Sequence, residues 1–96
     1  MTATAPSPKE SDLFPMKINL KMFSVIKDAV GSKEMTIEVS PGMSLGDLLR
    51  ELLFRYPKLK PHVKSIMFAV NRDFADLRTK LNEGDEVALM PPIGGG

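Results

Sequence analysis

The sequence lacks most of the groups on which enzymes and metalloproteins rely. It contains no cysteine among its 96 residues and only one histidine, His62. Without cysteine the chain has no disulfide, no thiolate nucleophile, no side-chain persulfide and no thiolate-bound metal. One histidine is also too few for a metal site or a catalytic dyad built on imidazoles within one chain. We therefore expect no bound metal, and few of the usual catalytic groups remain.

Neither sign of charge is concentrated, and no long hydrophobic run is present. The 13 basic and 12 acidic residues are scattered and leave a net charge of +1, which argues against a nucleic-acid or anionic-membrane surface. No apolar run approaches the roughly 20 residues needed to cross a bilayer, and the N-terminus lacks a signal-peptide pattern. With 43% hydrophobic and 26% charged residues, the composition is typical of one globular domain. We expect a cytoplasmic protein that binds neither nucleic acid nor membrane.

The two ends of the chain differ in composition from the part between them. Residues 1–15 are rich in Pro, Ser, Thr and Ala without any periodicity, which predicts a mostly disordered N-terminal arm. Residues 16–92 are predicted to form the folded domain, and residues 93–96, with the sequence Ile-Gly-Gly-Gly, a flexible tail. Glycines have no side chain with which to pack and lose more backbone freedom on ordering than other residues.

Within the domain, apolar and polar residues alternate in several short runs, as expected for strands with one buried face. These runs predict strands over residues 16–22, 34–40, 66–71, 74–77 and 86–90. The spacing of the first two predicts an antiparallel pair with a long connection. A short helical turn is predicted over residues 25–30, ended by Gly31 as its C-cap, and a loop over residues 58–64.

The helix that follows Ser44 is the clearest predicted element. Leucines and one tyrosine recur at i, i+3, i+4, i+7, i+8 and i+11 from Leu45, which gives one apolar face. Ser44 is a good N-cap, Asp47 completes something close to a capping box, and Pro57 ends the helix. A sheet can bury one face against this helix, so the sequence predicts a two-layer α+β domain.

The C-terminal stretch carries a family resemblance. It reads Asn-Glu-Gly-Asp-Glu-Val-Ala-Leu-Met-Pro-Pro-Ile-Gly-Gly-Gly over residues 82–96. This resembles the ending of the MoaD family, whose last strand typically reads G-D-E-V-A, two apolar residues, P-P, two variable positions and Gly-Gly. The match includes Phe-Ala-Val-Asn at residues 68–71 and the strand-turn opening up to Gly31. It implies a ubiquitin-like β-grasp fold, a mixed sheet packed on one main helix, over residues 16–96.

The resemblance also implies a function, since MoaD proteins are the small, sulfur-carrying subunits of molybdopterin synthase. Their terminal glycine is adenylated by an E1-like activating enzyme, MoeB, with ATP and is then converted to a thiocarboxylate. The large synthase subunit, MoaE, uses that sulfur to make the dithiolene of molybdopterin. Carried over here, Gly96 would bear first the adenylate and then the sulfur as 1-thioglycine. The chain alone would be non-catalytic and would bind no cofactor.

The residues before Gly96 suit such a role. Pro92, Ile93, Gly94 and Gly95 are expected to enter the active site of the partner, where glycines permit a thin chain in a narrow channel. Six extended residues span at most roughly 20 Å. Two consecutive prolines stiffen the base of the tail and direct it away from the sheet.

A partner interface is predicted from apolar side chains that fall outside the alternating core pattern. Phe23, Phe74 and Met90, with Pro91 beside them, are expected to cluster on the exposed face of the sheet. Contiguous exposed apolar patches usually mark interfaces, and Met and Phe suit a surface that must fit two partners. Alternatively, these side chains cover the edges of the core where strands twist. The resemblance favours the interface, because family members use this face for both partners.

Two other functions share the same C-terminal activation. The chain is also compatible with a ubiquitin-like modifier whose Gly96 is joined to lysines of target proteins. A sulfur carrier for thiamin or tRNA thiolation is the remaining alternative.

Overall fold

The computed structural model describes residues 15–92, and the predictions for residues 1–14 and 93–96 lie outside it. In chain order the elements are β1 (Met16–Met22), α1 (Ser24–Val30), β2 (Glu34–Val39), α2 (Leu45–Arg55), the 3-10 helix η2 (Pro57–Ser65), β3 (Met67–Val70), β4 (Asp73–Ala75) and β5 (Glu86–Met90). The predicted order of strands around one main helix is confirmed. α1 is the short helical turn predicted after the first strand, and Gly31 ends it in the left-handed region at φ 91°.

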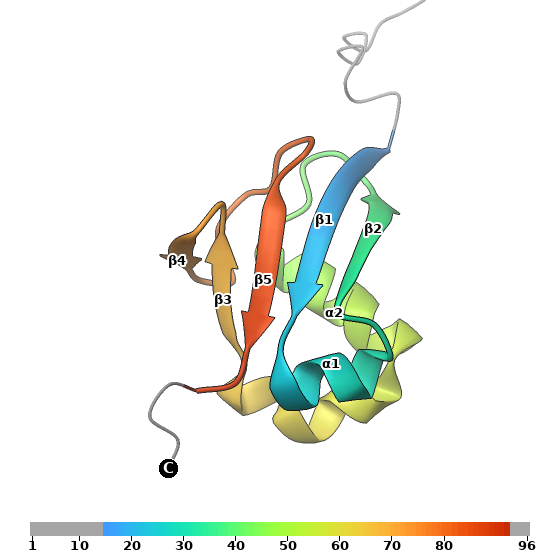
Figure 1. Cartoon of the computed structure of the whole chain (residues 1–96). Helices are drawn as coiled ribbons and strands as arrows, with labels where there is room; N and C mark the ends of the chain where they lie inside the picture. The colour runs from blue at the N-terminus through green and yellow to red at the C-terminus, as the bar shows by residue number, and fades with distance from the viewer. Residues whose placement is uncertain (1–14, 93–96) are drawn as a thin grey trace, which may run out of the picture.

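The strands form one five-stranded sheet in the order β2-β1-β5-β3-β4. β1 and β5 are parallel, whereas the pairs β1–β2, β3–β5 and β3–β4 are antiparallel. The last strand therefore lies at the centre of the sheet, next to the first. In Figure 1 the sheet faces the reader and α2 lies behind it, so the predicted two-layer α+β architecture is confirmed.

The core lies between the sheet and α2, where the alternating residues of the strands meet the apolar face of the helix. Ile18, Leu20 and Met22 of β1 are 0–2% exposed. From β5, Val87 and Leu89 are fully buried, and so are the α2 leucines that face them. Burying a large aliphatic side chain contributes roughly 1.5–3 kcal/mol, so this set holds α2 against the sheet.

α2 begins at a complete capping box. The Ser44 hydroxyl accepts a hydrogen bond from the Asp47 N–H at 3.2 Å, and the Asp47 carboxylate accepts one from the Ser44 N–H at 3.1 Å. Both satisfy N–H groups that a helix start leaves without partners. The helix ends at Arg55, and Pro57 follows as the first residue of η2.

Two elements differ from the prediction. The segment predicted as a loop over residues 58–64 lies within the 3-10 helix η2, because the buried Leu59 anchors it to the core and its N–H donates to the Tyr56 carbonyl. The short strand predicted over residues 74–77 ends at Ala75. It stops there because the Asp76 carboxylate accepts a hydrogen bond from the Arg78 N–H at 2.8 Å and turns the chain.

Candidate functional site: the open face of the sheet

The face of the sheet opposite α2 is left uncovered by the helices in Figure 1, and it divides into two halves. The half over β1 and β2 is polar. It presents Lys17, Asn19, Lys21, Glu34, Thr36 and Glu38. Asn19 accepts a hydrogen bond from Thr36 at 2.9 Å, and Lys21 lies 3.6 Å from the carboxylate of Glu86. Polar side chains of this half thus already pair with one another.

The half over β5, β3 and β4 is apolar. Met90 pairs with Met67 across β5 and β3, Ala88 pairs with Ala69, and Ala69 pairs on its other side with Phe74. Paired residues on neighbouring strands have side chains on the same face. We name this surface the exit patch, since it surrounds the end of the strand that leads to the C-terminus. It comprises Phe23, Met67, Ala69, Phe74, Ala88 and Met90.

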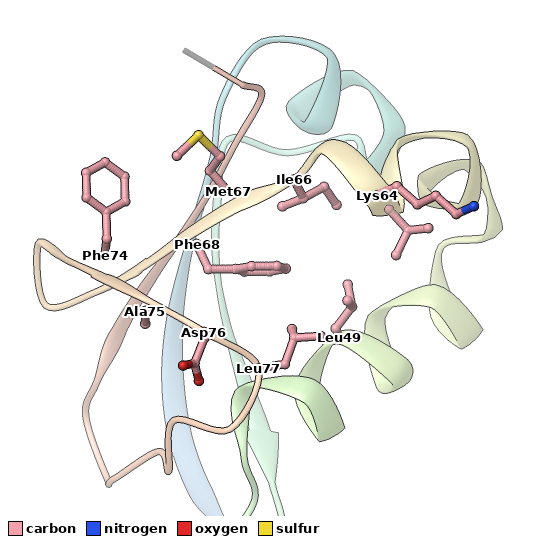
Figure 2. A pocket seen from close by; sticks show the side chains of 10 residues that line it. Leu49, Lys64, Ile66, Met67, Phe68, Phe74, Ala75, Asp76 and Leu77 are labelled. Carbon is pink, nitrogen blue, oxygen red and sulfur yellow. The ribbon is translucent and has the colours of Figure 1, made fainter.

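Phe74 is the most exposed member of the exit patch, with 66% of its surface accessible. Figure 2 shows Phe74 and Met67 projecting to one side of β3 and β4, while Phe68 points to the other side, toward Leu49 of α2. Phe68 is buried in the core. A phenylalanine that exposes most of its ring gains little from folding, so Phe74 is available for a contact outside the chain.

Phe23 lies beside the end of β5. It follows Met22 in extended conformation, and its N–H donates a hydrogen bond to the Leu89 carbonyl at 3.2 Å. The β1–β5 register pairs Met22 with Leu89, so one further residue sets Phe23 opposite Met90. Phe23 is 46% exposed. Pro91 is half-buried and Pro92 exposed at this end of the strand.

The hairpin that carries Phe74 is fixed to β5 by one asparagine. Asn71 and Arg72 have φ of 52° and 75°, as in a two-residue hairpin turn. The Asn71 amide donates to the buried Asp85 carboxylate at 2.9 Å and accepts a hydrogen bond from the Glu86 N–H at 3.0 Å. The second oxygen of Asp85 accepts from the Asn82 N–H at 2.8 Å. Asn71 therefore ties the turn before Phe74 to the start of the strand that ends in Met90.

The structure brings three of the residues predicted as a partner interface, Phe23, Phe74 and Met90, to one face, with Pro91 at its edge. Their contact with a partner stays a prediction. The sequence analysis did not predict Met67, Ala69 and Ala88 as part of this surface. Each alternates with a core residue along its strand, and this alternation could have placed it on the open face. Ile93, Gly94, Gly95 and Gly96, for which the role in a partner's active site was predicted, lie outside the described residues.

Three further exposed apolar side chains in residues 15–92 carried no functional prediction, and the first is Val25 of α1, which is 43% exposed. Leu77 is 48% exposed beside the turn after β4, and Phe54 is 84% exposed on α2. Phe54 lies on the side of the helix opposite the core leucines, which its position in the 3.6-residue repeat indicates.

The carboxylate of Asp47 serves the fold. The backbone N–H and hydroxyl of Ser44, with a smaller contribution from Arg50, hold the pKa of Asp47 below its ordinary value of 3.8. This carboxylate caps α2 and lies outside the exit patch. Within the same residues no group of three His, Cys, Asp or Glu side chains is placed to hold a metal ion, and no helix is long and apolar enough to cross a membrane.

A profile of the ThiS family matches residues 20–96. The chain belongs to the ThiS family. Among curated relatives of this ThiS-family protein, the molybdopterin synthase sulfur carrier subunit of Mycobacterium tuberculosis is 35% identical over 82 residues, which cover 84% of this chain and 99% of the relative. The resemblance to the MoaD family, first seen in the C-terminal stretch, is thereby confirmed.

Solved structures of related proteins share the fold of this ThiS-family chain. Small archaeal modifier protein 1 of Haloferax volcanii has a TM-score of 0.74 and 28% identity, covering 83% of this chain and 99% of that one. A complex of subunits 1 and 2 of the molybdopterin-converting factor of Helicobacter pylori contains a chain with a TM-score of 0.60 and 27% identity, covering 84% of this chain and 100% of that one. The predicted ubiquitin-like β-grasp fold is confirmed.

Proposed function

We propose that this protein is the sulfur-carrier small subunit of a molybdopterin synthase, acting in the cytoplasm in molybdenum-cofactor biosynthesis. Its Gly96 is adenylated, converted to a thiocarboxylate, and donates sulfur to the pterin precursor. The observation that carries the proposal is the exit patch, which surrounds the end of the strand leading to the terminal glycines. The name of the Mycobacterium tuberculosis relative and the two-subunit complex from Helicobacter pylori support it.

The chemistry requires a partner for its first steps. A free α-carboxylate has a pKa of about 3.3–3.7, so it is ionised at neutral pH and resists nucleophilic attack. Its oxygen attacks the α-phosphorus of ATP and pyrophosphate leaves, which gives an acyl-adenylate. A sulfur nucleophile then displaces AMP. The chain has no glycine-rich nucleotide loop, so an E1-like enzyme resembling MoeB supplies the nucleotide site.

The large subunit, resembling MoaE, then receives the tail. In this assembly the exit patch docks on the partner and buries Phe74 and Phe23, while Pro91 and Pro92 direct the following residues into the partner's active site. The polar half of the open face stays in water. The division of the sheet thus orients the domain so that the end of β5 faces the partner.

Intact-mass measurement tests the sulfur chemistry. The purified protein is incubated with the E1-like enzyme of its host, ATP and a sulfur source. We expect a mass gain equal to the replacement of one oxygen by sulfur, located at Gly96 by fragmentation. A chain without Gly96 is the matched control and should gain nothing while keeping its thermal midpoint. No gain on the intact chain would contradict every sulfur-carrier function considered for it.

A ubiquitin-like modifier is the second candidate, favoured by the likeness to small archaeal modifier protein 1. It predicts isopeptide-linked ladders in extracts of the host, lost when Gly96 is deleted. A sulfur carrier for thiamin or tRNA thiolation predicts the same mass gain but no complex with a large synthase subunit. Co-purification of the large subunit and the presence of ladders together separate the three functions.

A further inference from the structure

The backbone between β1 and α1 turns at a residue that is not glycine. In residues 15–92 the left-handed region of the backbone holds three glycines and three residues with side chains, namely Gly31, Gly42, Gly84, Ser24, Asn71 and Arg72. A side chain is sterically disfavoured in this region, whereas glycine enters it freely. Asn71 and Arg72 form the hairpin turn between β3 and β4, which requires this conformation at both positions. Ser24, at φ 55°, is therefore the left-handed residue that hairpin geometry does not explain.

Ser24 lies between two core residues and next to an exposed phenylalanine. Met22 at the end of β1 and Ile26 in α1 are 2% and 1% exposed. Phe23 is extended, at φ −127° and ψ 148°, and is 46% exposed. Figure 1 shows the turn from β1 into α1 beside the end of β5. The chain thus leaves the core at Phe23 and returns to it at Ile26, and Ser24 makes the change of direction.

The hydrogen bonds that hold Phe23 include two long ones. Its N–H donates to the Leu89 carbonyl at 3.2 Å, and its carbonyl accepts from the N–H groups of Ile26 at 3.0 Å and Lys27 at 3.3 Å. Backbone hydrogen bonds usually span about 2.7–3.2 Å between nitrogen and oxygen, so the Leu89 and Lys27 contacts lie at or beyond the long end. Burial fixes only part of the ring, because nearly half of the residue is accessible. A further restraint is needed to keep the ring in one direction.

The Cβ atom of Ser24 supplies that restraint. A residue with a Cβ atom can enter the left-handed region only within a small area, near φ of about 50–70° and ψ of about 30–60°. Glycine ranges over a wider area. Ser24 is exposed, and its hydroxyl makes no hydrogen bond to any residue from 15 to 92. The side chain therefore acts on the fold through its Cβ atom, by restricting the backbone next to Phe23.

We propose that Ser24 is a positioning residue for docking of the large synthase subunit. Its Cβ atom confines the turn between β1 and α1, so the Phe23 ring is held beside Met90 before the partner arrives. A side chain that is already ordered costs less free energy to bind than one that must be ordered on contact. Sparsely populated backbone conformations cluster at binding sites for such preorganisation. The inference rests on the proposed function, and it adds a residue that lies outside the exit patch.

Two substitutions at Ser24 separate the Cβ atom from the hydroxyl. Ser24→Gly removes both, whereas Ser24→Ala removes only the hydroxyl. Titration calorimetry of the full chain with the large subunit of its host measures binding. We expect Ser24→Gly to bind about fivefold more weakly than the wild type, and Ser24→Ala to bind about threefold more tightly than Ser24→Gly. Equal affinities of the two variants would overturn the role of the Cβ atom.

An alanine-to-glycine change within α1 tests whether general loosening of the helix has the same effect. Ala29 is half-buried in α1 and packs against the core. Glycine inside a helix is destabilising, so Ala29→Gly should lower the thermal midpoint while changing binding less than about twofold. Ser24→Gly should lower the midpoint less, because glycine relieves the steric conflict at φ 55°. A loss of binding by Ala29→Gly as large as that by Ser24→Gly would mean that both act through the stability of α1, which would overturn the inference.

Backbone relaxation of the free protein shows directly whether Phe23 is preorganised. ¹⁵N order parameters are about 0.85 for rigid amides and below about 0.6 for flexible ones. We expect the Phe23 amide to be rigid in the wild type and in Ser24→Ala, and to move toward the flexible range in Ser24→Gly. The amide of Phe74, which lies on another strand, is the internal control and should keep its value. A Phe23 amide that is equally ordered in all three proteins would overturn the positioning role.

Failure of the proposed function gives a different result. A wild type that gains no sulfur and binds no large subunit would contradict the proposed function itself. A wild type that binds the large subunit, with Ser24→Gly equal to it in affinity, would overturn only the positioning role of Ser24.

Discussion

At the scale of the residue, two exposed phenylalanines have different surroundings. Phe54 is 84% exposed on the outer side of α2, between charged residues such as Arg50 and Glu51. Phe74 is 66% exposed, but Met67 and Ala69 lie beside it on the same face. Single exposed apolar side chains are ordinary on protein surfaces, whereas contiguous ones mark interfaces. By exposure alone, Phe54 would be the stronger candidate for a contact with a partner. The apolar neighbours of Phe74 make Phe74 the stronger candidate instead.

Phe74→Glu should weaken binding of the large subunit by about 1–2 kcal/mol, because it places a charge in the centre of an apolar contact. Phe54→Glu is the matched control and should change binding by less than about 0.5 kcal/mol. Calorimetric titration measures both, and thermal melting confirms that both variants stay folded. Equal effects on binding would contradict the assignment of the exit patch as the docking face.

At the scale of the element, the start of α2 depends on a charge. Hydrogen bonds from the Ser44 N–H and hydroxyl, and then the nearby Arg50, lower the pKa of Asp47 below 3.8. A carboxyl group with a lower pKa in the folded state than in the unfolded state stabilises the fold above the unfolded pKa. That contribution is lost as the pH falls through the folded pKa.

Asp47→Asn should therefore be less stable than the wild type at pH 7, and the difference should shrink as the pH drops below 3.8. Urea unfolding at pH 7 and pH 3 measures the free energy of unfolding of both proteins. A difference between Asp47→Asn and the wild type that is constant with pH would contradict the role of the charge.

The hairpin between β3 and β4 makes a second prediction at this scale. Asn71→Gly removes both side-chain hydrogen bonds, one of them to the buried Asp85 carboxylate, and should cost about 1–3 kcal/mol of unfolding free energy. Asn71→Ala should cost about 1 kcal/mol more, because alanine is strained in the left-handed region that Asn71 occupies at φ 52°. The order of stabilities in urea should be wild type, glycine variant, alanine variant. A glycine variant as stable as the wild type would show that the Asn71 side chain does not hold the hairpin.

Elements with local signals were predicted closely from the sequence, and those fixed by tertiary contacts were not. α2 has a capping box, a 3.6-residue apolar repeat and a terminating proline, all readable between Ser44 and Pro57. β1 and β5 alternate cleanly. By contrast, η2 forms where Leu59 is anchored in the core, and β4 ends where Asp76 turns the chain. Such contacts leave no periodic pattern in the sequence.

At the scale of the whole molecule, the two layers of the fold separate stability from recognition. The face against α2 holds the buried residues, and the opposite face holds the exit patch beside a polar half. The sequence predicted that Phe23, Phe74 and Met90 lie on the open face, because each departs from the alternating pattern of the core residues. It did not predict the apolar groove lined by Leu49, Ile66 and Leu77, because these residues come from separate elements that meet only after folding. Hydrophobic pattern assigns residues to faces, whereas a cavity depends on how elements pack.

The parallel pairing of β1 with β5 also constrains how the protein is made. Asn19 pairs with Glu86 and Met22 with Leu89, so the sheet cannot close until its last strand has left the ribosome. A nascent chain interrupted before residue 86 lacks the central strand that joins β2–β1 to β3–β4, so the sheet against which α2 packs is incomplete. The sheet therefore forms only after β5 has been synthesised. The ribosome must therefore synthesise β5 before the domain can fold and bind a partner.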